Sequence, residues 1–218
     1  MKQYHVAVIG ATGMVGQRFV TLMENHPWFR LTALAASARS AGKTYEEAVA
    51  NRWALDIPMP EEAKKIVVLD AEADAEKLAG MVDFCFCAVD MKKEDIRALE
   101  EKYAKLECPI VSNNSAHRWT DDVPMVVPEI NPEDVKKHKG IIANPNCTTI
   151  VSLVAINALN QDSPIESIVA SSYQAVSGAG AGGPIELMNE VEALGLGQQI
   201  EPKVFQYQIA YNVIPQIG

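Results

Sequence analysis

The segment HVAVIGATGMVG, residues 5–16, joins an apolar run to a helical pattern through a turn that contains three glycines. Residues 5–10 read as a buried strand, and residues 14–26 carry apolar side chains at helical spacing. Glycines in such a turn permit a tight bend and the close approach of a pyrophosphate, whose charge the first N–H groups of the helix would receive. The GxxGxxG spacing here predicts a dinucleotide-binding turn, the alternative being a plain strand–helix connection without a ligand.

Strand-like and helix-like segments continue to alternate through the first half of the chain. Residues 92–107 form an amphipathic helical pattern with acidic residues in the first turn, and further buried strands are predicted at 31–37, 65–70, 82–90, 108–114 and 140–146. Near-continuous apolar strands separated by helices are typical of a parallel sheet that is covered on both faces. We therefore predict an α/β fold with a Rossmann-like doubly wound parallel sheet.

The pattern changes near residue 145. Residues 163–180 form a β-rich run that ends in a glycine cluster, and residues 183–195 resemble a short helix. We predict a dinucleotide-binding domain over 1–145, followed over 146–218 by the beginning of an α+β catalytic and dimerisation domain. Because the last residues, AYNVIPQIG, add no closing element, we expect this second domain to be incomplete and the chain to be truncated.

The composition narrows the choice of partners and location. The 218-residue chain is 48% hydrophobic and has a net charge of −9, which disfavours nucleic acid and anionic membranes as partners. No apolar run approaches the roughly 20 residues that a membrane span needs, and the N-terminal residues lack the pattern of a cleavable signal. The four cysteines do not suggest a disulfide framework, so we expect a reducing, cytoplasmic location, and no metal site is predicted.

The loop after the second predicted strand, ASARSAGK, indicates the choice of cofactor. A site that prefers NAD usually has an acidic residue here to bind the ribose hydroxyls, and this loop has none. The hydroxyls of Ser37 and Ser40 and the guanidinium of Arg39 suit a 2′-phosphate, with Lys43 nearby. The pattern favours NADP(H), the alternative being a solvated polar loop.

Cys147 lies in NPNCTT, residues 144–149, between a predicted strand and an apolar helical run. A thiol at a helix start is close to unpaired N–H groups and the positive end of the helix dipole, which favour a thiolate. Cys85, Cys87 and Cys108 lie within or beside apolar strands instead and are interpreted as packing residues. Position and residue type predict that Cys147 is a nucleophile that acts beside a nicotinamide on an aldehyde or acyl phosphate.

Four motifs then occur in the order found in one enzyme family. They are GATGMVGQ, SNNSAHRW followed by DDVPMVVPEIN, NPNCTT and SYQAVSGAG. On these motifs the chain resembles the aspartate-β-semialdehyde dehydrogenase family over essentially its whole length. The resemblance implies NADPH-dependent reduction of β-aspartyl phosphate to aspartate semialdehyde, a step in lysine, threonine, methionine and isoleucine biosynthesis. It also implies a homodimer or homotetramer for the full-length protein.

The resemblance also implies roles for individual residues. Cys147 matches the nucleophile that forms the acyl thioester, and Gln174 matches the glutamine that orients the substrate at that thioester. Arg118 matches the arginine that holds the acyl phosphate, and Asn146 matches an asparagine that lines the thioester pocket. The residues that match the cofactor site are Thr12, Gly13, Met14 and Val15 at the pyrophosphate, Ser37, Arg39 and Ser40 at the 2′-phosphate, and Asn114 and Gly178 near the nicotinamide.

Part of the family pattern falls beyond residue 218, including further substrate-binding residues and the general acid/base histidine. None of the histidines present, at positions 5, 26, 117 and 138, matches that histidine. The alternatives are therefore a catalytically incompetent cofactor-binding fragment or pseudoenzyme, and a related acyl-phosphate or acyl-CoA reductase. N-acetyl-glutamyl-phosphate reductases are similar, but their cysteine motif usually reads NPGCYPT, so NPNCTT favours the aspartate enzyme.

Overall fold

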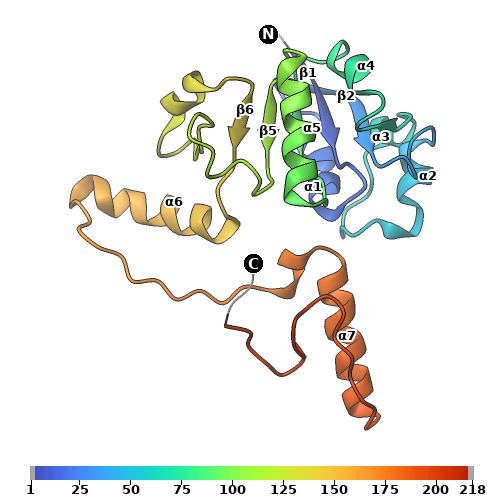
Figure 1. Ribbon diagram of the computed structural model, residues 1–218, viewed down its shortest axis with the longest axis vertical. Coiled ribbons are helices and arrows are strands. Elements are labelled where there is room, and N and C mark those ends of the chain that lie inside the picture. The colour runs from blue at the N-terminus through green and yellow to red at the C-terminus, as the bar shows by residue number, and fades with distance from the viewer. Residues whose placement is uncertain (1–2, 216–218) are drawn as a thin grey trace. The chain divides into compact units, whose positions relative to one another are not determined.

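The computed structural model describes residues 3–215 and divides into two compact units, Met1–Val169 and Ala170–Gly218, each of which is described by itself. The elements of the first unit are β1 (Tyr4–Ile9), α1 (Met14–Leu22), β2 (Phe29–Ala36), α2 (Tyr45–Val49), η1 (Ala50–Arg52), α3 (Glu61–Lys64), β3 (Leu69–Asp70), α4 (Ala75–Ala79), β4 (Phe84–Cys87), α5 (Lys93–Lys105), β5 (Ile110–Ser112), η2 (Pro132–Lys137), β6 (Ile141–Ala143) and α6 (Cys147–Asp162) (Figure 1). The second unit contains η3 (Val176–Ala179) and α7 (Gly182–Gly195).

The six strands form one parallel sheet in the order β3–β2–β1–β4–β5–β6. This is the strand order of the Rossmann fold, so the predicted doubly wound sheet is confirmed. In such a sheet the order reverses between the first and fourth strands, and ligands bind outside the carboxyl ends of the strands at that point. The β3 strand is much shorter than the predicted 65–70 because Val67 forms an isolated antiparallel bridge with Thr44 instead.

Two apolar clusters show that both faces of the sheet are covered. Ala7 and Ile9 of β1 point to one face, where they pack in a cluster with buried residues of α4 and α5. Val8 points to the other face, where the cluster includes buried residues of α1, α2 and α3. The alternation along β1 places its side chains in both cores, which explains why the strand is apolar throughout. Figure 1 shows α5 lying across one face of the sheet.

The predicted helix over 92–107 is confirmed as α5, with one unexpected feature. Its first turn carries Glu94 and Asp95, and its last turn carries lysines, which complements the helix dipole at both ends. The buried stripe at helical spacing contains Ile96, Leu99 and Tyr103, and it also contains the carboxylate of Glu100. This buried acid contacts side chains at the carboxyl edge of the sheet.

The expectation of β-structure over residues 163–180 is wrong for the described residues. None of them pairs as a strand, and residues Val176–Ala179 form a 3-10 turn. Extended propensity produces a strand only where a neighbouring strand accepts the hydrogen bonds, and the described residues offer none here. The predicted helix over 183–195 is confirmed as α7.

Two carboxylates of α7 hold the segment 203–210 of the second unit. Glu186 accepts hydrogen bonds from the backbone N–H groups of residues 203, 204 and 205, at 2.6–2.9 Å. Desolvation raises the pKa of Glu186, but these backbone bonds outweigh it and leave the pKa below its usual value. Glu190, one turn later, accepts from the N–H groups of Ile209 and Ala210. Buried acids on one face of α7 therefore organise this part of the second unit. The predicted domain boundary near residue 145 stays a prediction.

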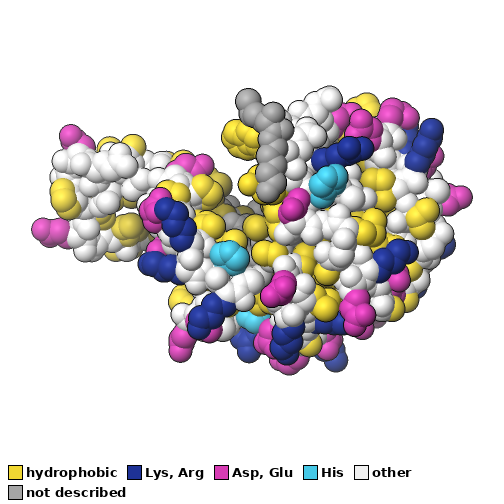
Figure 2. All heavy atoms as spheres, turned by 90° about the horizontal axis from the view of Figure 1, so that it is seen from above, with side chains coloured by type: hydrophobic (Ala, Val, Ile, Leu, Met, Phe, Trp, Pro, Cys, Tyr) yellow, Lys and Arg dark blue, Asp and Glu magenta, His cyan; other side chains and the backbone are white. Residues whose placement is uncertain are grey.

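The surface carries both signs of charge. In Figure 2, acidic and basic side chains are interspersed across the face drawn, with apolar atoms between them. Among residues 3–215, no helix combines the length and apolar character that crossing a membrane would require. Within the same residues, no three or more His, Cys, Asp or Glu side chains are grouped so that they could hold a metal ion.

Candidate active site at the carboxyl edge of the sheet

The turn between β1 and α1 depends on Gly10 and Gly16 for its packing. Gly10 has a φ of +84°, and a Cβ on it would lie 2.3 Å from the carbonyl oxygen of Ala88. A Cβ on Gly16 would lie 2.2 Å from the carbonyl oxygen of Gly10. Gly13 differs, because the nearest atom to a Cβ there would be the Gly10 oxygen at 3.5 Å. Space is therefore open only at Gly13, which is the N-cap of α1.

This open position fits the pyrophosphate of a dinucleotide. The Gly13 cap has no side-chain hydrogen bond, and the first turn of α1 carries no acidic residue. An uncapped helix start presents unpaired N–H groups and a positive dipole end, both of which favour an anion. Thr12 and Met14 are partly exposed around the turn, and Val15 is exposed. These features favour an anion at the turn, and the assignment of Thr12, Gly13, Met14 and Val15 to a pyrophosphate stays a prediction.

Two buried side chains brace this turn from within the first unit. The hydroxyl of Tyr45, at the start of α2, donates to the carbonyl oxygen of Ala11 at 2.8 Å. The amide nitrogen of Gln17 donates to the carbonyl oxygens of Thr12 and Arg52 at 3.1 and 2.9 Å, and its oxygen accepts from the N–H of residue 54. These contacts tie the turn to α2 and η1, so its shape is held before any ligand binds.

We expect Tyr45→Phe to lower the free energy of unfolding by about 1–2 kcal/mol, because it leaves the buried carbonyl of Ala11 without this donor. Urea unfolding monitored by circular dichroism measures the change. Tyr173→Phe is the matched control, since the side chain of Tyr173 is exposed, and its unfolding should be unchanged. Equal stability of Tyr45→Phe and the unsubstituted chain would contradict the bracing role.

The loop after β2 lies beside the glycine turn. The N–H groups of Gly10 and Ala11 both donate to the carbonyl oxygen of Ala35, near the end of β2, at 2.9 and 3.1 Å. Ser37 and Arg39 are exposed at this edge. Ser40 is packed inward, with only 4% of its surface exposed, and its N–H donates to the oxygen of Ser37. The assignment of this loop to a 2′-phosphate stays a prediction, and Ser37 and Arg39 are its accessible members.

The ends of β5 and β6 are joined by a hydrogen-bonded network around Arg118. The Asn144 side chain donates to the side-chain oxygen of Asn113 at 2.7 Å. The Arg118 Nε donates to the carbonyl oxygen of Asn144 at 2.9 Å, and an Nη donates to that of Asn113 at 3.4 Å. Burial lowers the pKa of Arg118, and the negative charge of a Cys147 thiolate acts in the opposite direction. The two carbonyl contacts therefore hold the guanidinium beside the segment that leads to Cys147, with its remaining donors available to an anion.

Cys147 is the first residue of α6 and its side chain is exposed, as the sequence predicts. Asn146 caps this helix, because its side-chain oxygen accepts from the N–H groups of Thr148 and Thr149 at 3.0 and 3.3 Å. The other three cysteines are buried, as expected for packing residues. The predicted place of Asn146 in a thioester pocket stays a prediction. The capping hydrogen bonds of Asn146 orient the start of α6, which carries the thiol.

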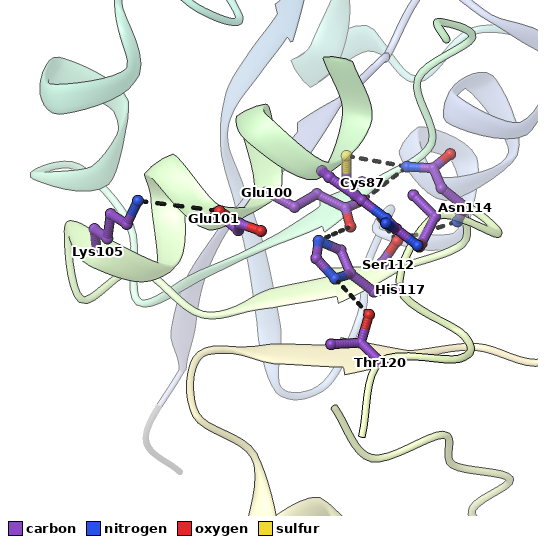
Figure 3. Close-up of polar contacts among 10 residues, drawn as sticks. Cys87, Glu100, Glu101, Lys105, Ser112, Asn114, His117 and Thr120 are labelled. Carbon is purple, nitrogen blue, oxygen red and sulfur yellow. Dashed lines mark hydrogen bonds and ion pairs between the residues drawn. The ribbon is translucent and has the colours of Figure 1, made fainter. Parts of the chain in front are cut away.

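Asn114 belongs to a buried polar cluster below the same edge. Its side-chain nitrogen donates to Glu100 Oε1 at 2.8 Å, and its backbone N–H donates to the hydroxyl of Ser112 at 3.1 Å. Figure 3 shows the Glu100 carboxylate between Asn114 and His117. His117 is 3% exposed and its ring contacts Thr120, so it lies inside the fold and not at the solvent-exposed edge.

Gln174 and Gly178 belong to the second unit and lie close together within it. A Cβ on Gly178 would be 2.6 Å from the side-chain nitrogen of Gln174, so this glycine leaves room for the amide. Their predicted roles beside the thioester and the nicotinamide stay predictions. The first-unit residues of the predicted site all come to one edge of the sheet, since they follow the carboxyl ends of β1, β2, β5 and β6.

Sequence reasoning missed Glu100, Gln17 and Tyr45. For Glu100 a signal was present. Glu100 lies four residues after Ile96 and one after Leu99, and at this helical spacing it faces the same side of the helix as these two apolar residues. Gln17 follows directly on the glycine motif, and its helical position beside Gly16 was the available signal. No local pattern identifies Tyr45, whose partner lies 34 residues earlier in the chain.

Comparisons with known proteins agree with this arrangement. Two protein-family models match the chain, "Semialdehyde dehydrogenase, NAD binding domain" over residues 5–138 and "Semialdehyde dehydrogenase, dimerisation domain" over residues 156–218. The aspartate-semialdehyde dehydrogenase of Methanothermobacter thermautotrophicus is 42% identical over 189 residues, which are 82% of this chain and 52% of that protein. The Aquifex aeolicus protein of the same name is 39% identical over 220 residues, 98% of this chain and 59% of the relative.

Solved structures show the same likeness. The aspartate semialdehyde dehydrogenase II from Vibrio cholerae, complexed with ASA, matches with a TM-score of 0.83 and 34% identity, over 100% of this chain and 60% of that one. The aspartate semialdehyde dehydrogenase with NADP from Candida albicans matches with a TM-score of 0.66 and 31% identity, over 75% of this chain and 48% of that one. The chain thus spans between about half and three fifths of the length of these relatives. With both family models matched, and with the glycine turn and Cys147 placed at the carboxyl edge of a Rossmann-type sheet, the chain belongs to the semialdehyde dehydrogenase family.

Proposed function

We propose that this chain carries the nucleophile and the cofactor-binding site of an enzyme that reduces β-aspartyl phosphate to aspartate semialdehyde with NADPH. The observation that carries this proposal is the position of Cys147, exposed at the first residue of α6, three residues after Asn144, whose carbonyl oxygen accepts from Arg118 Nε. A nucleophilic thiol beside a fixed guanidinium suits an acyl phosphate, which needs both an attacking group and stabilisation of the departing phosphate. The curated relatives are named aspartate-semialdehyde dehydrogenases, which supports aspartate semialdehyde as the aldehyde of the proposed reaction.

The proposed chemistry begins with attack of Cys147 Sγ on the acyl carbon of β-aspartyl phosphate. A C–S bond forms, the C–O bond to the phosphate breaks, and phosphate leaves with that electron pair. Some guanidinium donors of Arg118 are used by the carbonyl oxygens of Asn144 and Asn113. The remaining donors stabilise the charge on the phosphate. NADPH, when bound, supplies the hydride that reduces the thioester carbonyl. Release of the Cys147 sulfur as a thiolate then frees the aldehyde, and Gln174 is proposed to orient the substrate throughout.

The cofactor would be held at two places on the first unit. The helix start at Gly13 would receive the pyrophosphate, because its N–H groups and open space favour an anion. The exposed Ser37 and Arg39 would receive the 2′-phosphate. The match of residues 156–218 to a dimerisation domain supports a homo-oligomer for the full-length protein. The relatives' names support a role in amino-acid biosynthesis, and a cytoplasmic location is part of the proposal.

We expect Arg39→Ala to weaken NADPH binding about tenfold and to leave NADH binding unchanged, because a charge-assisted bond to the 2′-phosphate is lost. Fluorescence titration of each nucleotide measures the two dissociation constants. Arg30→Ala is the matched control, since Arg30 is an exposed arginine on β2 away from the carboxyl edge, and it should change neither constant. Equal weakening of NADPH and NADH would contradict the 2′-phosphate assignment.

The substrate proposal is tested in the reverse direction, by NADP⁺ reduction with aspartate semialdehyde and inorganic phosphate. An intact-mass measurement on the same sample establishes which chain is being assayed. Turnover that requires phosphate supports the acyl-phosphate reaction. Turnover with coenzyme A in place of phosphate would support an acyl-CoA reductase instead. Nucleotide binding without turnover by a chain of 23.7 kDa would support the alternative, a cofactor-binding fragment that is not active by itself.

A further inference from the structure

A buried carboxylate determines how Asn114 is held at the end of β5. Glu100 has no exposed surface, and its Oε1 accepts from the Ser112 hydroxyl at 2.6 Å and from Asn114 Nδ2 at 2.8 Å. The Ser112 hydroxyl in turn accepts the backbone N–H of Asn114 at 3.1 Å. The three contacts fix both the main chain and the side chain of Asn114. A further contact, from Asn114 Nδ2 to Cys87 Sγ at 3.4 Å, attaches the same amide to β4.

The second oxygen of this carboxylate faces His117. Glu100 Oε2 and His117 Nε2 are 4.0 Å apart, and within the described residues neither atom has a hydrogen-bond partner. A distance of 4.0 Å is too long for a direct hydrogen bond, so the two groups face each other without bonding directly. An isolated buried carboxylate is costly, and the donors on Ser112 and Asn114 that bind Oε1 offset that cost. The other ionisable side chains here are the Cys87 thiol and Arg97, whose Nε donates to the oxygen of Ala116.

The carboxylate determines which way the Asn114 amide points. Glu100 Oε1 accepts from the Ser112 hydroxyl and from the amide nitrogen of Asn114, so the nitrogen of the amide faces Glu100 and its oxygen faces away. Asn114 lies at the carboxyl end of β5, where Rossmann-type sheets bind their ligands. A carbonyl oxygen presented there is an acceptor for a carboxamide N–H₂ group, and a nicotinamide carries that group. If the Asn114 amide were reversed, its N–H₂ group would face the N–H₂ group of the nicotinamide, and two donors cannot form a hydrogen bond.

We propose that Glu100 is a positioning residue for the nicotinamide end of the site, where its buried carboxylate, opposite His117, orients the amide of Asn114. The inference rests on the proposed NADPH-binding function. Glu100 itself touches neither cofactor nor substrate, because Ser112 and Asn114 lie between it and the sheet edge. Its effect should therefore appear in the binding of the nicotinamide half of the cofactor and not in the adenosine half.

The test compares NADPH with 2′,5′-ADP, which carries the 2′-phosphate but no nicotinamide. Glu100→Gln removes the charge that assists both hydrogen bonds and presents an N–H₂ group that can reverse the amide of Asn114. We expect it to weaken NADPH binding about tenfold, as Asn114→Ala should, while the dissociation constant of 2′,5′-ADP changes by less than about twofold. Glu101→Gln is the matched control, since Glu101 is the next residue of α5, exposed and near Lys105, and it should change neither constant.

Two results would overturn the inference. Unchanged NADPH binding by Glu100→Gln is one, and equal weakening of NADPH and 2′,5′-ADP, which indicates a merely structural role, is the other. If Glu100→Gln does not fold, Glu100→Asp takes its place, because the shorter side chain withdraws the oxygen that accepts from Ser112 and Asn114. The same split between the two nucleotides is then expected, and its absence overturns the inference.

Failure of the proposed function is distinguishable from failure of this inference. If the unsubstituted chain binds neither NADPH nor 2′,5′-ADP, the cofactor proposal is wrong. Hydrogen exchange of the Asn114 side-chain amide, measured by nuclear magnetic resonance, then tests the positioning without a nucleotide. Exchange about tenfold or more faster in Glu100→Gln than in the unsubstituted chain supports the orientation of Asn114 by Glu100, and equal rates overturn it.

Discussion

Cys147→Ser is expected to reduce NADP⁺ reduction by aspartate semialdehyde and phosphate by more than about 10³-fold, because the reaction then lacks the sulfur that forms the thioester. The substitution changes one exposed atom at the start of α6, where Asn146 supplies the cap, so the fold should persist. Steady-state absorbance of NADPH measures the loss. Nucleotide binding should remain, which separates the missing nucleophile from a damaged cofactor site. Retention of turnover by Cys147→Ser would exclude the thioester mechanism.

Cys108→Ser is the matched control for this experiment. Cys108 is buried beside β5, and its sulfur lies 3.5 Å from that of Cys85 and away from the sheet edge. Cys85, Cys87 and Cys108 are buried, so alkylating agents should reach these thiols slowly, and burial also raises the pKa of the Cys87 thiol well above its usual range. Iodoacetamide is expected to add once to the folded chain, at Cys147, as seen by mass spectrometry. A first adduct at any other cysteine would contradict the assignment of the reactive thiol.

Gly16→Ala is expected to lower the free energy of unfolding by about 3 kcal/mol or more, because overpacking against rigid backbone cannot relax by a change of rotamer. The new Cβ would lie 2.2 Å from the Gly10 oxygen and 2.7 Å from the Ala11 Cα, which are both backbone atoms. Relief requires α1 to move away from β1, and this opens the core around Val20. Urea unfolding measures the loss of stability, and NADPH binding should be lost together with it.

Gly13→Ala separates stability from cofactor binding in the same turn. Its backbone is extended, with φ of −79° and ψ of 163°, and the nearest atom to the added Cβ is 3.5 Å away. We therefore expect its stability to stay within about 1 kcal/mol of the unsubstituted chain. The methyl group would occupy the open space in which the pyrophosphate is proposed to sit, so NADPH should bind about tenfold or more weakly. Stability loss equal to that of Gly16→Ala, or undiminished NADPH binding, would contradict this account of the turn.

Local patterns were sufficient for the parts of the fold that short segments determine. The apolar run ending at Gly10, the glycine spacing and the helical stripe of α5 each reflect interactions within a few residues or the alternation of one strand. The same is true of Cys147, since an asparagine cap followed by an apolar helical run places it at a helix start. The prediction of β-structure over 163–180 was wrong because a strand depends on more than local sequence: it exists only where another strand pairs with it.

The sequence by itself determined the Rossmann-type sheet, the dinucleotide turn and the helix start that carries the thiol, since periodicity and capping are local. Only the tertiary structure decided which polar side chains hold the site. Glu100 lies within a helix rich in charged residues, and its burial becomes evident only when the end of β5 brings Ser112 and Asn114 to its carboxylate. Tyr45 likewise has its role because α2 packs near the glycine turn. Hydrogen bonds between distant segments depend on where the sheet places those segments, and no spacing along the chain records that.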